Sequence, residues 1–126
     1  MYQTKINSIG YLQTSSQAYG ESVELFADTD LGETPMSLVT IALASCVNMC
    51  VQSFFYHRFS QKDVQVRTNA QLSERSVFLQ IEILGQDTLE VASKEQLISF
   101  IESHCKVKKL LATDIHFDYE FSGSKE

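Results

Sequence analysis

The chain has 126 residues, which is near the size of one ordinary domain and too short for two comfortable ones. Hydrophobic residues make up 44% of the chain and charged residues 21%, with 1 Pro, which excludes a disordered, collagen-like or low-complexity protein. The formal charge of −6 argues against a nucleic-acid partner. From the length and the charge together we expect a single acidic domain over residues 1–126.

The first 30 residues are predicted to be rich in β-strand. Residues 5–9 alternate in polarity, and Gly10 marks a bend or turn. Val23 and Leu25 predict a further strand before the loop that starts at Asp28.

A long helix is predicted to begin at Thr34 and Pro35. Thr accepts a backbone N–H as the N-cap residue, and Pro at the first helical position has no N–H to leave unpaired. Residues 36–57 carry no formal charge and place apolar groups on every face, over a length on the order of 33 Å. Such a helix is either buried on all sides or inserted in a membrane.

Polar residues scattered through this helix favour burial over a membrane. They are Ser37, Thr40, Ser45, Asn48, Gln52, Ser53 and His57. A few strands in a 14.2 kDa chain cannot easily cover so long an apolar helix on every side. We therefore predict an obligate homodimer with this helix at its centre and no membrane contact.

The chain returns to strand after Arg58. Residues 64–72 alternate as in a half-buried strand, and a turn at 73–75 leads to a second strand. The second strand carries Val77, Leu79, Ile81 and Ile83 on one face, so the two predict an antiparallel hairpin.

Two shorter helices and a last strand complete the prediction. Ser93, with Gln96 three residues later, predicts a capped helix start before the apolar stripe of Leu97, Ile98 and Ile101. A short basic helix is expected from Lys106 to about Leu111. The last strand should point Ile115, Phe117, Tyr119 and Phe121 inward and His116, Asp118 and Glu120 outward. The fold class is α+β, an antiparallel sheet packed on one long and two shorter helices.

The three cysteines are the residues most suited to chemistry. Their odd number argues against a secreted disulfide framework, and the N-terminus shows no signal-peptide pattern, so we expect a cytoplasmic protein. Cys46 and Cys50 lie four residues apart on the long helix, where free cysteines often act as small hydrophobes. A disulfide between them would distort the helix, so either would pair only with Cys105.

Cys105 stands at the break between two predicted helices. Helix N–H groups and the charges of Lys106, Lys108 and Lys109 would lower its pKa. The alternative is a surface cysteine beside solvated lysines. A metal site of Cys46, Cys50, His104 and Cys105 is conceivable, but adjacent ligands are not the spacing of structural zinc sites, so no metal or cofactor is expected.

Motifs of other enzyme classes are missing from the sequence. It contains no G-x-S-x-G, P-loop, G-x-G-x-x-G or H-E-x-x-H pattern. The segment GETPMSLVTIALASC from Gly32 to Cys46, with CKVKKLL from Cys105 to Leu111, resembles the OsmC/Ohr family of osmotically inducible and organic hydroperoxide resistance proteins. The order of elements along nearly the whole chain is also similar to that family.

The resemblance implies a fold and a chemistry. The fold would be an intertwined homodimer with antiparallel sheets wrapped around long, central, buried helices. Cys46 would be the catalytic residue that attacks a peroxide, organic or hydrogen peroxide, and becomes a sulfenic acid. Cys105 would condense with it to a disulfide, which a dithiol, such as a lipoylated protein, would reduce. Such a protein would serve in the response to oxidative stress.

The sequence departs from the family at three positions. Family members carry an early Arg that stabilises the thiolate, but the first Arg here is Arg58. Met36 and Ser37 stand where a Glu is expected, and Lys106 stands where Pro is common. Two alternatives therefore stay open: a non-catalytic dimeric binding module, and a redox sensor that forms the disulfide once without turnover.

Overall fold

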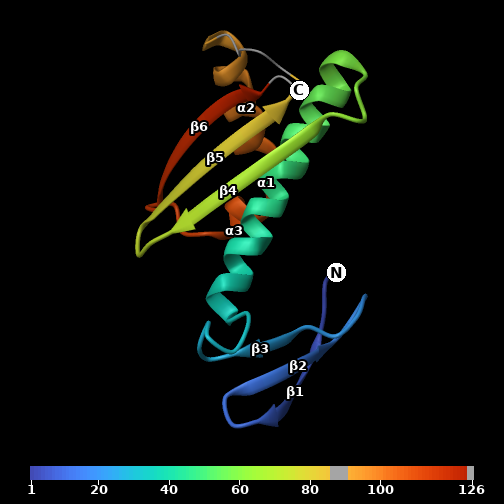
Figure 1. Ribbon diagram of the computed structural model, residues 1–126, viewed down its shortest axis with the longest axis vertical. Coiled ribbons are helices and arrows are strands. Elements are labelled where there is room, and N and C mark those ends of the chain that lie inside the picture. The colour runs from blue at the N-terminus through green and yellow to red at the C-terminus, as the bar shows by residue number, and fades with distance from the viewer. Residues whose placement is uncertain (86–90, 125–126) are drawn as a thin grey trace. The chain divides into compact units, whose positions relative to one another are not determined.

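The computed structural model describes residues 1–85 and 91–124 (Figure 1). The elements are β1 (Lys5–Gly10), β2 (Gln13–Gln17), β3 (Glu24–Phe26), α1 (Pro35–Phe59), β4 (Gln65–Leu72), β5 (Ser76–Leu84), α2 (Val91–His104), α3 (Lys106–Leu110) and β6 (His116–Ser124). They form two compact units, Met1–Val39 and Thr40–Glu126. One domain over residues 1–126 therefore stays a prediction.

The first unit contains an antiparallel sheet in the order β1-β2-β3. The predicted strands at residues 5–9 and around Leu25 are confirmed. β2, with the sequence QTSSQ, was not predicted, because it has no apolar alternation and is recognisable only through its pairing with both neighbours. Every residue of β1 is exposed, including Ile6 and Ile9.

The start of α1 is as predicted. The Thr34 side-chain oxygen accepts a hydrogen bond from the Ser37 N–H at 3.1 Å, and the Ser37 hydroxyl oxygen accepts one from the Thr34 N–H at 2.7 Å. This reciprocal pair satisfies two N–H groups that a helix start leaves free. The helix ends at Phe59, where Ser60 has a φ of 56°.

The second unit contains a sheet in the order β4-β5-β6. The predicted hairpin is confirmed, with Leu72 opposite Val77 and Gln65 opposite Leu84. The all-antiparallel prediction is wrong for β6, which pairs parallel to β5. The helices α2 and α3 form the crossover that returns the chain to the same end of the sheet. An alternating pattern reports which residues share a face, but it carries no information on strand direction.

The core of this unit lies between its sheet and its helices, which all lie on one side of the sheet (Figure 1). The predicted inward face of β5 is confirmed, since its four apolar residues are almost completely buried. Along β6 the inward and outward residues alternate as predicted. Leu97 and Ile101 bring α2 into the same core. The expected helix start at Ser93 is wrong, because α2 begins at Val91.

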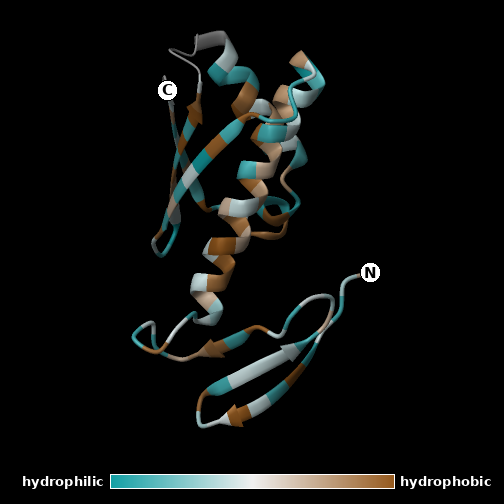
Figure 2. Cartoon of the chain, turned by 45° about the vertical axis from the view of Figure 1, so that its right-hand side comes forward, coloured by the Kyte–Doolittle hydropathy of each residue, from teal (hydrophilic) through white to brown (hydrophobic). Residues whose placement is uncertain are grey.

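α1 is covered by the second unit on one side only. The buried residues Leu43, Val47, Cys50, Val51, Phe54 and Phe55 form that side. The opposite side carries Ile41, Ser45, Met49, Gln52, Tyr56 and Phe59, which we call the exposed stripe. Figure 2 shows apolar residues on successive turns of α1. By length and a mean hydropathy of 1.8 the helix could cross a membrane, but its buried side is part of the core, as in the central helix of a globular domain.

Candidate functional site

The three cysteines meet inside the second unit. The sulfur atoms of Cys46, Cys50 and Cys105 all lie within 4.8 Å of one another, and each residue is a free thiol. Cys46 and Cys50 are one helical turn apart on α1, so they project on neighbouring parts of its surface. Cys105 comes from the junction of α2 and α3. We call this set the sulfur cluster.

The junction of α2 and α3 places Cys105 in the core. Its N–H donates to the Ile101 carbonyl at 2.9 Å, and its carbonyl accepts from the Lys109 N–H at 3.2 Å. The residue thus closes one helix and caps the next, with extended backbone angles between them. The predicted break is confirmed. The alternative of a surface cysteine is wrong, since Cys105 is 0% exposed.

The three thiols differ in their access to solvent. Cys105 is completely buried and Cys50 is 7% exposed, whereas Cys46 is only half-buried. On α1, Cys46 lies between the buried side and the exposed stripe. A reagent from solvent therefore reaches the sulfur cluster first at Cys46.

The thiols of Cys50 and Cys105 shift each other's pKa in opposite directions. A hydrogen bond from the Cys50 thiol lowers the pKa of Cys105; burial opposes this shift, and the backbone N–H of Lys108, the Cys46 thiol and the backbone N–H of Val107 reinforce it. The same hydrogen bond to Cys105, together with burial, raises the pKa of Cys50 far above the usual thiol range. These opposite shifts favour the thiolate at Cys105 and the protonated thiol at Cys50.

The lysine charges have a different role from the one expected. The Lys108 ammonium group pairs with the carboxylate of Glu102 and lies 4.3 Å from the centre of the Phe117 ring. The strongest influence on Cys105 is instead the Cys50 thiol, which sequence spacing had left without a role. The four-residue interval between Cys46 and Cys50 indicated that both cysteines lie on one side of the helix. It does not reveal that Cys105 packs against that side.

His104 is not part of the sulfur cluster. Its ring stacks on Phe100 with the ring centres 4.0 Å apart. Its Nδ1 lies 2.9 Å from the Phe100 carbonyl oxygen and 2.8 Å from the Ser103 hydroxyl. Of the four possible metal ligands considered from the sequence, His104 is excluded and the three cysteine sulfurs remain.

Tyr119 is a neighbour that the sequence identified only as an inward strand residue. Its hydroxyl is buried, and among the residues that the structure describes it has no partner of standard hydrogen-bond geometry, although the Glu102 carboxylate influences it. Burial raises the pKa of Tyr119, and negative charge on Glu102, Cys105 and Cys50 raises it further. Tyr119 packs against the core cluster that contains Cys50 and Cys105.

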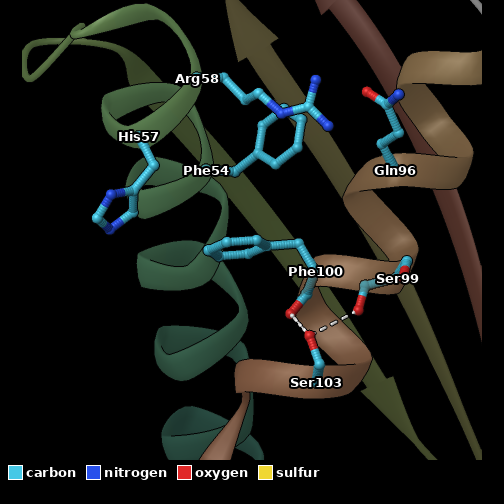
Figure 3. Close-up of a pocket in the computed structure, with 7 residues that line it drawn as sticks. All are labelled: Phe54, His57, Arg58, Gln96, Ser99, Phe100 and Ser103. Carbon is cyan, nitrogen blue, oxygen red and sulfur yellow. Dashed lines mark hydrogen bonds between the residues drawn. The ribbon is translucent and has the colours of Figure 1, made fainter.

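A hollow of about 330 Å³ lies between α1 and α2 (Figure 3). Its lining combines two phenylalanine rings with polar groups: Phe54, His57, Arg58, Gln96, Ser99, Phe100 and Ser103. The Arg58 guanidinium lies 5.4 Å from the centre of the Phe54 ring, and the two rings meet edge to face. The hollow starts one helical turn beyond Cys50 on α1.

Comparisons with known proteins place this geometry in context. No family model and no curated protein matches the sequence. Solved structures match it over nearly the full length. A hypothetical protein from Aquifex aeolicus is similar with a TM-score of 0.78 and 14% identity, covering 100% of this chain and 98% of that one.

Two further similar structures are of proteins whose names indicate a family. An OsmC-like protein from Mycoplasma pneumoniae matches with a TM-score of 0.69 and 12% identity, covering 99% of this chain and 96% of that one. The organic hydroperoxide resistance protein OhrB of Bacillus subtilis matches with a TM-score of 0.68 and 12% identity, covering 95% and 98%. The resemblance to the OsmC/Ohr family is thus confirmed in the fold: the chain has the α+β fold of OsmC-like and organic hydroperoxide resistance proteins.

Proposed function

We propose that this protein is an OsmC-like thiol peroxidase that reduces organic hydroperoxides or hydrogen peroxide with Cys46 and Cys105. The observation that carries the proposal is the meeting of a half-buried thiol with a buried, thiolate-prone one, their sulfurs within 4.8 Å. The names of two structural neighbours, an OsmC-like protein and an organic hydroperoxide resistance protein, support the choice of substrate class.

The proposed reaction starts at Cys46, the most accessible sulfur. Its thiolate attacks one peroxide oxygen, the O–O bond breaks, and the leaving oxygen takes a proton to become an alcohol or water. Cys46 is then a sulfenic acid. This first step consumes the peroxide and oxidises only one sulfur.

Cys105 carries out the second step. Its thiolate attacks the sulfur of the sulfenic acid, a disulfide forms, and the sulfenic oxygen leaves as water after it takes a proton. A lowered pKa suits this role, because the thiolate is the nucleophile. The two sulfurs must close to about 2.05 Å, so the α2–α3 junction has to move toward α1 in this step.

A dithiol is the proposed reductant. Its first thiolate would attack the disulfide at Cys46, since Cys105 has no exposure to solvent. Its second thiol would release the mixed disulfide and return both cysteines to the thiol form. A lipoylated protein is one source of such a dithiol, and a cytoplasmic location would provide the reducing surroundings.

We also propose that the functional unit is a homodimer formed through the exposed stripe of α1. Its apolar members Ile41, Met49, Tyr56 and Phe59 are between 43% and 65% exposed. Ser45 and Gln52 lie among them, but four large apolar side chains exposed along one helix face are unusual in a folded chain, and a second copy of the same helix would cover them. Cys46, at the flank of this surface, would then lie beside the partner chain.

The experiment uses the reduced full-length protein and cumene hydroperoxide. We expect one equivalent of peroxide to produce a disulfide that links the Cys46 and Cys105 peptides, seen by peptide mapping with mass spectrometry. Cys46→Ser should consume no peroxide, and Cys105→Ser should stop at the sulfenic acid. His104→Gln is the matched control and should react as the unmodified chain does. Absence of the Cys46–Cys105 disulfide would refute the proposal.

A redox sensor is the second candidate, and the burial of Cys105 favours it. With Cys105 buried, a reductant can reach the disulfide only at the half-buried Cys46, and slow reduction there would let the disulfide persist as a signal. Repeated peroxide additions in the presence of dihydrolipoamide separate the two functions. A peroxidase consumes many equivalents of peroxide per chain, and a sensor consumes one.

A further inference from the structure

We propose that Cys46, Cys50 and Cys105 form a binding site for one soft metal ion of the Zn²⁺ and Cu⁺ class. The proposal rests on the geometry of the reduced sulfur cluster and does not require peroxidase activity. It makes Cys50 a direct ligand, whereas in the two-cysteine reaction Cys50 acts only through its hydrogen bond to Cys105.

The spacing of the sulfurs fits a single ion. Zn–S bonds are about 2.3 Å long, so sulfurs that share one ion at tetrahedral or trigonal angles lie roughly 3.8–4.0 Å apart. The three sulfurs already lie within 4.8 Å of one another. Side-chain rotations and small shifts at the α2–α3 junction are enough to close this difference.

The chemistry of the ligands selects the kind of ion. Three thiol sulfurs without a carboxylate or imidazole among them favour soft ions over Mg²⁺, Ca²⁺ or Mn²⁺. Three protein ligands leave a fourth position for Zn²⁺, and three are sufficient for Cu⁺ in a trigonal site. The half-buried Cys46 marks the side from which the ion would enter.

The surroundings of the cluster supply a further group suited to a metal site. Ligand sulfurs are commonly held by hydrogen bonds from residues around the site. Tyr119 packs against the same core as the three cysteines, and its buried hydroxyl has no partner of standard hydrogen-bond geometry in the described part of the chain. It would donate to a metal-bound thiolate, which also satisfies a hydroxyl that is otherwise costly to bury.

Placing the ion changes the proton balance of the cluster. In the free chain all three cysteines are unbridged thiols. The ion takes the place of the thiol protons, which are released to solvent as each sulfur binds. No sulfur is oxidised or reduced in this step. A bound ion would also occupy Cys46 and Cys105, so it would compete with a peroxide for them.

The test is a titration of the reduced full-length chain with Zn²⁺ alone, against a chromophoric chelator, with a phosphine reductant that supplies no thiol. We expect one ion per chain. A parallel titration with Cd²⁺ should show thiolate-to-metal charge-transfer absorption. Cys50→Ser should weaken binding by more than about tenfold, because one of the three ligands is lost. His104→Gln is the matched control and should bind as the unmodified chain does.

Three outcomes would overturn the proposal: no binding by the reduced chain, undiminished binding by Cys50→Ser, or equal weakening by His104→Gln. Far-UV circular dichroism establishes that each variant is folded, and Cys50→Ala serves as a second variant if the Ser form does not fold. The peroxide experiment is independent of this one. A chain that binds Zn²⁺ without forming the Cys46–Cys105 disulfide refutes the peroxidase alone, and the reverse result refutes the metal site alone.

Discussion

The two sides of α1 are both apolar but differ in what covers them. One side, from Leu43 to Phe55, packs into the core of the second unit and carries Cys50. The other side, the exposed stripe, carries Met49 at 65% exposure and Phe59 at 58%. The exposed stripe also carries Ser45 and Gln52, so it is less apolar than the buried side, but it keeps four apolar side chains in contact with solvent. Their difference teaches that one three-stranded sheet and α2 cover only one side of α1, which leaves apolar residues on the other side exposed within a single chain.

The largest effect is expected from Phe54→Ala on the buried side. Phe54 is 4% exposed and contacts the rings of Phe55 and Phe100, so its removal leaves a cavity. We expect a loss of about 3–5 kcal/mol in the free energy of unfolding, measured by urea titration. Tyr56→Ala on the exposed stripe is the matched variant. Because the proposed dimer covers Tyr56, its removal should cost at least half as much; a smaller cost would show that nothing covers the stripe.

The next largest effect is expected on the oligomeric state when the exposed stripe is changed. The double variant Ile41→Glu with Met49→Glu places two charges on the proposed dimer surface, and buried unpaired charges are costly. We expect sedimentation equilibrium to change from a dimer to a monomer. Ala112→Glu with Thr113→Glu, in an exposed loop, makes the same change in charge and should remain dimeric. If the unmodified chain sediments as a monomer, the proposed dimer is wrong.

The pH dependence of stability tests the buried thiol pair in the reduced, metal-free chain. The pKa of Cys105 is lowered in the folded chain, so below the ordinary value of 9.0 the unfolded chain holds a proton that the folded chain has released. The free energy of unfolding should therefore rise toward pH 9.0, by at most about 1.4 kcal/mol per pH unit, and be lost as the pH falls.

Above that pH the sign reverses. The pKa of Cys50 is raised, so the folded chain keeps a proton that the unfolded chain has lost, and stability should fall. Urea titrations at several pH values measure both limbs. Cys105→Ser should remove the rise, and a rise that persists in this variant would contradict the assignment of the thiolate to Cys105.

The smallest change in the free energy of unfolding is expected on replacing Asn48, whose side chain connects α1 to β4 by hydrogen bonds. Its side-chain NH₂ donates to the Val66 carbonyl at 2.9 Å and to the Thr68 hydroxyl at 3.1 Å. Asn48→Ala should cost about 1 kcal/mol in the free energy of unfolding, because two acceptors lose their donor. Gln52→Ala removes only an exposed donor to Asn48 and should cost less. Equal costs would show that the contacts with β4 add no stability.

Much of the fold could be predicted from local patterns. Thr34 and Pro35 defined the start of α1, and the apolar alternation from Val77 to Ile83 defined a buried strand, because capping and period-two burial are local properties. The strand QTSSQ and the parallel pairing of β6 could not be predicted in this way. Both depend on which segment lies beside them, and that is decided by the path of the whole chain.

The candidate site also has features that are local in the sequence and features that depend on the path of the chain. By itself the sequence determined that Cys46 and Cys50 lie one turn apart in a helical stretch without charge and that Cys105 lies at the break between two helices. Helical spacing and helix breaks are local properties of the sequence. Only the tertiary structure decided that all three sulfurs meet, that Cys50 is the proton donor to Cys105, and that His104 stacks elsewhere on Phe100. The physical reason is that burial and electrostatic coupling depend on distances between segments far apart in the chain, which packing of the core alone establishes.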